Sequence, residues 1–79
     1  MKIFTLLVIA TDKDKNTSVD VKVFERKPDA SSYLRGIRNN KPKGAIDEVL
    51  SYGWKYKITI PNGTTIIYEI KKQDLIYLY

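Results

Sequence analysis

The sequence predicts a small α+β domain in which an antiparallel or mixed β-sheet of four to five strands carries one or two short helices on one face. The chain has 79 residues, the length of a single domain spanning residues 1–79. Apolar and polar residues alternate near both ends, as in half-buried strands. Between these segments, apolar residues recur at intervals of three and four, as on an amphipathic helix. The expected order is β-β-α-α-β-β-β.

The first two strands should form a hairpin. Ile3 to Ala10 is apolar on both alternating faces, which predicts a central strand that is covered on both sides or that shares a dimer interface. Asp12 to Ser18 is a polar loop, and Val19 to Arg26 alternates again. In this second strand we expect the side chains of Val19, Val21 and Val23 to point into the core. The side chains of Asp20, Lys22 and Arg26 should point outward.

A first short helix should follow Pro28, which suits a first helical turn. One apolar stripe supports it, formed by Ala30, Tyr33, Leu34 and Ile37. Gly36 should cost this helix about 1 kcal/mol relative to alanine. Asn39 to Gly44 reads as a loop.

A second short helix is predicted from Ala45 to Tyr52. Ala45, Ile46, Val49 and Leu50 share one helical face in this segment. Asp47 and Glu48 lie in its early turns, and Gly53 can end it.

The hairpin from Trp54 to Lys71 can be paired residue by residue. Pro61-Asn62-Gly63 suits a three-residue loop in which Gly63 adopts the left-handed conformation. The predicted cross-strand pairs are Ile58 with Ile66, Tyr56 with Tyr68, Trp54 with Ile70, Thr59 with Thr65, and Lys55 with Glu69. The aromatic residues of this hairpin are expected in the core, and Ile67 is expected to be exposed on the opposite face. Leu75 to Tyr79 is expected to form a last strand beside the first.

The opening Met1-Lys2-Ile3-Phe4 and the strand-strand-helix beginning resemble the ubiquitin-like β-grasp family. The resemblance covers about half of the chain and implies a fold only. Conjugation requires an exposed Gly-Gly end, whereas the sequence ends in Leu78-Tyr79.

Catalysis, cofactor binding and metal binding are not expected. The chain has no cysteine and no histidine, so thiolate chemistry, the commonest general base and the commonest transition-metal ligand are excluded. Asp12, Asp14 and Asn16 match the start of an EF-hand loop, but Thr17 and Val23 stand where glycine and a bidentate glutamate are required. The apolar N-terminal segment is too short for a secretory signal, and no membrane span is visible, which predicts a cytoplasmic location.

The net charge of +5 favours an anionic partner. The strongest charge feature runs from Ala30 to Ile46, which contains no acidic residue between its ends. The predicted partner-binding residues are Arg35, Arg38, Lys41 and Lys43, with help from Lys55 and Lys57. The first functional hypothesis is therefore a small basic, non-catalytic binding protein that contacts nucleic acid or a nucleic-acid-handling protein complex.

The second hypothesis is a protein-interaction module or inhibitor of a host protein, which acts through a sheet edge or through self-association. Ile67 and the segment from Leu75 to Tyr79 are its candidate contacts. In size and composition the chain also resembles the accessory proteins of phages and mobile elements. No motif links it to one of them, and no small-molecule substrate is expected.

Overall fold

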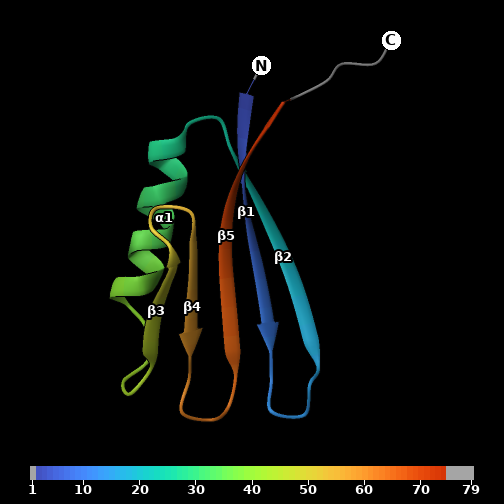
Figure 1. Cartoon of the computed structure of the whole chain (residues 1–79), viewed down its shortest axis with the longest axis vertical. Helices are drawn as coiled ribbons and strands as arrows, with labels where there is room; N and C mark the ends of the chain where they lie inside the picture. The colour runs from blue at the N-terminus through green and yellow to red at the C-terminus, as the bar shows by residue number, and fades with distance from the viewer. Residues whose placement is uncertain (1, 75–79) are drawn as a thin grey trace.

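A computed structural model describes residues 2–74 and shows five strands and one helix (Figure 1). The elements are β1 (Lys2–Thr11), β2 (Thr17–Phe24), α1 (Lys27–Asn39), β3 (Ile46–Ser51), β4 (Lys55–Thr59) and β5 (Thr65–Asp74). The strands form one sheet in the order β2-β1-β5-β4-β3, and every neighbouring pair is antiparallel. The predicted α+β class with an antiparallel sheet and a helix on one face is thus confirmed.

The centre of the sheet is the pair of long strands β1 and β5, which pair from Lys2 with Asp74 to Thr11 with Thr65. The apolar segment from Ile3 to Ala10 is therefore a central strand, as predicted, but among the described residues a helix covers only one of its two faces. On the side away from β5, β1 pairs with β2, so the predicted hairpin of the first two strands is confirmed. The expected last strand from Leu75 to Tyr79 lies outside the described residues.

The β4–β5 hairpin has the predicted register. Tyr56 pairs with Tyr68 and Ile58 pairs with Ile66, while Lys55 faces Glu69 on the other side of the sheet. In the loop, Gly63 has a φ of 94°, and the Ile60 N–H donates to the Thr64 carbonyl oxygen at 2.8 Å. The left-handed glycine lets the three-residue loop fit the twist of the strands.

The predicted second helix is wrong, because residues 46–51 form strand β3. Its residues pair with β4, for example Ile46 with Thr59 and Asp47 with Ile58. An isolated helix of eight residues is marginal, whereas pairing with an existing strand satisfies the same backbone groups. Gly53, the expected end of that helix, has a φ of 80° in the β3–β4 turn, where the Trp54 N–H donates to the Ser51 carbonyl oxygen at 2.9 Å.

The core lies between α1 and one face of the sheet. Its buried members are Leu6, Ala30, Leu34, Tyr56, Ile58, Tyr68 and Ile70. Ala30 and Leu34 belong to the predicted helical stripe, and Pro28 lies in the first turn of α1 as expected. Burial raises the pKa of the Tyr68 hydroxyl above its usual value, with a smaller contribution from Tyr33.

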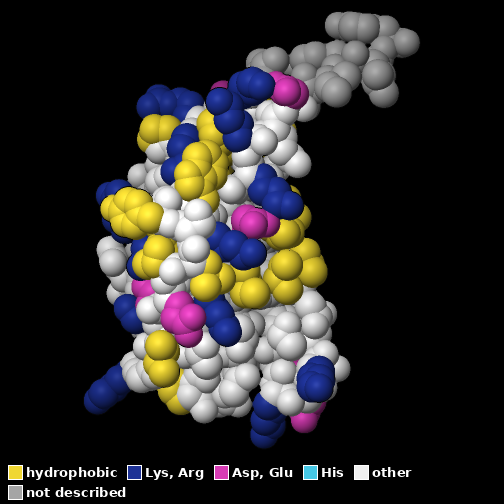
Figure 2. Space-filling model, viewed as in Figure 1, with side chains coloured by type: hydrophobic (Ala, Val, Ile, Leu, Met, Phe, Trp, Pro, Cys, Tyr) yellow, Lys and Arg dark blue, Asp and Glu magenta, His cyan; other side chains and the backbone are white. Residues whose placement is uncertain are grey.

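The orientation of β2 is opposite to the predicted one. Val19, Val21 and Val23 are 61%, 52% and 61% exposed and face away from the helix. Their alternate neighbours lie on the helix side, since Lys22 pairs with the buried Leu6 and its ammonium lies 5.5 Å from the Tyr33 ring centroid. The hydrophobic side chains over β2 are visible at the right of Figure 2. The register of the β1–β2 hairpin causes this result, because it aligns the lysine rather than a valine with the core residue of β1.

Candidate nucleic-acid interface

The six predicted partner-binding residues do not form one surface. Arg35 and Arg38 lie on α1, and Lys41 and Lys43 lie in the loop that follows it. Lys55 and Lys57 alternate with the buried Tyr56 and Ile58 and so lie on the face of the sheet opposite the helix. Lys55 and Lys57 are therefore not placed to extend a surface formed by the four cations of the helix and its following loop.

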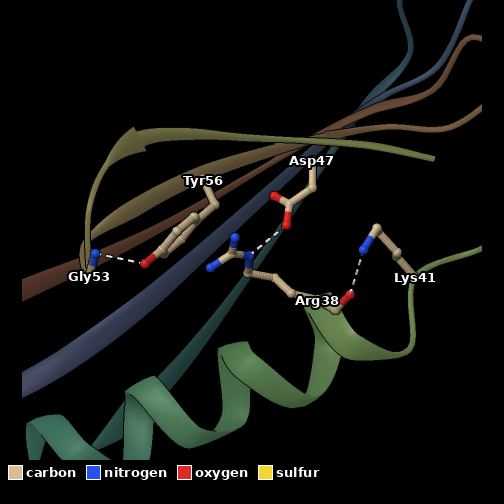
Figure 3. Close-up of polar contacts among 5 residues, drawn as sticks. All are labelled: Arg38, Lys41, Asp47, Gly53 and Tyr56. Atoms are coloured by element: carbon tan, nitrogen blue, oxygen red, sulfur yellow. Dashed lines mark hydrogen bonds and ion pairs between the residues drawn. The ribbon is translucent and has the colours of Figure 1, made fainter.

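Arg38 has a structural role. Its guanidinium lies 3.9 Å from the centroid of the Tyr56 ring, and its Nε donates to Asp47 Oδ2 at 2.8 Å (Figure 3). Only 28% of the arginine side chain and 16% of the aspartate side chain are exposed. The second Asp47 oxygen, Oδ1, is buried with no hydrogen-bond partner among the described residues. Arg38 therefore links α1 to β3 and β4, and only part of its charge is available to a ligand.

Two of the predicted lysines also have contacts within the chain. Lys41 Nζ donates to the Arg38 carbonyl oxygen at 3.3 Å, at the C-terminal end of the helix. Lys55 Nζ lies 3.7 Å from Glu69 Oε2. Lys43 is exposed. Lys57 is half-buried and lies on β4, as Lys55 does.

A cleft between α1 and the β3–β4 turn gathers positive charge instead. Its volume is about 260 Å³, and the lining residues are Lys27, Ser31, Leu34, Arg35, Arg38, Tyr52, Gly53, Tyr56 and Ile70. Three of these residues are cationic and none is acidic. Arg35 is exposed and has no ion pair among residues 2–74. The cleft combines cations, hydroxyl groups and an apolar floor.

An exposed aromatic residue lines this cleft, and a second one lies in the same turn. Tyr52 is 86% exposed and lines the cleft, and Trp54, in the same turn, is 39% exposed. Lys27 Nζ lies 4.6 Å from the centroid of the Trp54 ring and also donates to Ser31 Oγ at 2.8 Å. The predicted burial of Tyr56 and Tyr68 is confirmed, whereas Trp54 lies at the surface and not in the core.

The β3–β4 turn is held against the cleft by a hydrogen bond. The Gly53 N–H donates to the Tyr56 hydroxyl oxygen at 2.7 Å, and this oxygen retains its own O–H as a donor (Figure 3). The left-handed Gly53 thus positions the neighbouring Tyr52. The sequence analysis did not identify Lys27 or Tyr52 as site residues. Tyr52 was missed because it was assigned to a helix over residues 45–52 and not to a turn. The glycine that follows Tyr52 was the available signal for a turn.

The chain was compared with protein families, characterised proteins and solved structures, and no match was found. None of these comparisons supports the resemblance to the ubiquitin-like β-grasp, although the chain does begin with two strands and a helix. Among residues 2–74, no group of three or more acidic, histidine or cysteine side chains is placed to hold a metal ion. In the same part of the chain, no helix has the length and apolar character that crossing a membrane requires.

Proposed function

We propose that the protein is a small, non-catalytic nucleic-acid-binding protein that holds a single strand in the cleft between α1 and the β3–β4 turn. The observation that carries the proposal is the composition of the cleft: three cationic side chains, of which only Arg38 is paired with an acidic residue, no acidic side chain in the lining, and an exposed tyrosine. Proteins that bind single strands combine these two features, since cations contact the phosphates and aromatic rings stack on the bases.

Each side chain has a distinct role in this proposal. Arg35, which is exposed, offers a guanidinium fork to phosphate oxygens. Lys27 adds a second positive charge across the cleft, and Tyr52 offers an open ring face to a base. A concave cleft suits a single strand better than a duplex, because reading a duplex groove requires a protruding helix or hairpin.

The test is a titration of the protein with single-stranded and double-stranded DNA and RNA, followed through the fluorescence of Trp54 at two salt concentrations. Arg35→Ala should weaken single-strand binding and lower the salt slope by about 0.7, the value for one phosphate contact to a single strand. Tyr52→Ala should weaken binding by about 1–3 kcal/mol through lost stacking.

Lys57→Ala is the matched control, since it removes the same charge from the opposite face of the sheet. It should leave affinity nearly unchanged. Equal losses for Arg35→Ala and Lys57→Ala would show that only net charge matters. If neither DNA nor RNA bound at low salt, the proposal would be contradicted. Tighter binding to a duplex than to a single strand would contradict the assignment of the cleft to a single strand.

A further inference from the structure

Within the part of the chain that the structure describes, strand β2 is an edge of the sheet with no strand on its outer side. It contains no proline, its pairing with β1 runs without interruption, and every residue from Thr17 to Val23 is exposed. The other edge strand, β3, is shorter and has a register shift between Val49 and Ser51, an irregularity that discourages edge pairing. Unpaired N–H and C=O groups on a regular edge strand are a template for another strand.

The backbone groups that face this edge can be identified from the hairpin. The Asp12 N–H donates to the Asn16 carbonyl oxygen at 3.0 Å, which closes the β1–β2 loop with a hydrogen-bonded pair. Bonded and non-bonded pairs alternate in an antiparallel ladder, so Val19, Val21 and Val23 occupy positions not bonded to β1. Their N–H and C=O groups point outward. Consistent with this, the Val21 N–H donates to Asp20 Oδ1 at 3.0 Å, a contact within the strand that pairing with another strand would replace.

We propose that β2 pairs with β2 of a second copy of this chain, antiparallel and centred on Val21. In this register Val21 faces Val21 of the second copy, and Val19 faces Val23. Each outward valine exchanges backbone hydrogen bonds with a valine. Asp20 then faces Lys22 of the second copy, and the two-fold symmetry repeats this ion pair.

Charge complementarity favours this register over the two nearest ones, and it favours a second copy of the chain as the partner. A shift that centres the pairing on Asp20 sets two aspartates opposite each other, and one centred on Lys22 sets two lysines together. Like charges in directly opposite positions destabilise a strand pair, whereas opposite charges stabilise it. The Thr17–Phe24 strand is thus complementary to itself in the register centred on Val21.

Pairing would also cover apolar surface. Because the two-fold axis is perpendicular to the sheet, the valines of both copies lie on the same face, opposite the helices. Side chains that are 52–61% exposed in the single chain gain cross-strand neighbours. The resulting sheet is continuous across both copies, and the cationic clefts remain outside the interface.

The test is sedimentation of the full chain over a range of concentrations, which should show a dimer for the natural sequence. Asp20→Lys and Lys22→Asp should each raise the dimer dissociation constant at least roughly tenfold, because each replaces two opposite-charge pairs by like-charge pairs. The double variant Asp20→Lys/Lys22→Asp restores the pairs in reverse and should restore the dimer. Asp14→Lys, the same charge change in the exposed loop, should have no effect.

Amide hydrogen exchange of the natural protein tests the interface without any substitution. The amides of Val19, Val21 and Val23 should become protected as the dimer forms. A monomer at all concentrations would overturn the proposal. A dimer that survives both single charge reversals, or that leaves these three amides unprotected, would place the interface elsewhere and would equally overturn it.

Discussion

At the scale of single residues, Arg38 shows how a side chain expected to bind a partner can be required by the fold. It stacks on Tyr56 and pairs with Asp47, so three elements meet at one guanidinium. Arg35, one helical turn earlier, has neither contact among the described residues. The two arginines look alike in sequence but differ in burial, and burial decides their roles.

Replacing Arg38 should therefore destabilise the protein. In Arg38→Ala the half-buried Asp47 carboxylate loses its partner, and we expect a loss of about 1–3 kcal/mol in the free energy of unfolding. Urea unfolding measures this value. Arg35→Ala is the matched control and should change stability by less than about 0.5 kcal/mol. Equal losses in the two variants would show that the Arg38–Asp47 contact contributes nothing.

Asp12 makes the β1–β2 turn sensitive to acid. The backbone N–H of Asn16 donates to its carboxylate at 2.9 Å, and together with the Asn16 side chain and the Asp14 N–H it lowers the pKa of Asp12. A carboxyl group whose pKa is lowered by folding stabilises the native state at pH values above its pKa in the unfolded chain, which is about 4. This stabilisation disappears as the pH falls through the pKa of the folded protein.

The expected result is a lower titration midpoint for the Asp12 carboxyl in the folded protein than in the urea-unfolded chain. Carbon-detected NMR of the side-chain carboxyl measures both midpoints. Equal midpoints, or a higher one in the folded protein, would mean that these hydrogen bonds do not favour the ionised form.

At the scale of secondary structure, α1 contains a residue that weakens it without an evident packing reason. A Cβ added at Gly36 would meet nothing within 4 Å. Gly36→Ala should therefore stabilise the protein by about 0.5–1 kcal/mol, because alanine loses less backbone entropy in a helix. Thermal and urea unfolding measure the change.

Gly44 provides the contrast, since it has a φ of 83° and an added Cβ would lie 3.1 Å from Pro61 Cγ. Gly44→Ala should destabilise by at least about 1 kcal/mol. If Gly36→Ala were also destabilising, the open space beside α1 would be needed for another purpose, such as ligand contact.

The elements also show where sequence patterns suffice. The β4–β5 hairpin could be predicted pair by pair, because the Pro61-Asn62-Gly63 loop and both faces of the strands agreed on one register. Residues 45–52 were assigned wrongly, because Ile46, Val49 and Leu50 have the spacing of a helical stripe, and a segment this short does not distinguish a helix from a strand. Pairing with β4, a tertiary interaction, decided the outcome.

At the scale of the whole molecule, one helix covers one face of a five-stranded sheet, and no other element within residues 2–74 covers the opposite face. Alternation in β2 showed which residues share a face, but it could not show which face the helix covers. The valines therefore lie outside, where an inward position was predicted.

The same limit applies to the candidate site. The sequence shows how many cations there are but not which of them lie together. The cleft is formed by α1 and the β3–β4 turn, which are distant in the sequence, so no local pattern could predict that Lys27 and Tyr52 line the same cleft. The six cations predicted to bind a partner are divided instead, because Arg38 is paired with Asp47 and Lys55 is paired with Glu69.

The most direct test of the proposed function is an NMR titration of the protein with a short single-stranded oligonucleotide. We expect the largest shifts at the Lys27, Arg35, Tyr52 and Gly53 signals, with little change at Lys55 and Lys57 on the opposite face. The largest shifts at those two lysines, or uniform small shifts over the whole surface, would contradict the assignment of the cleft as the binding site.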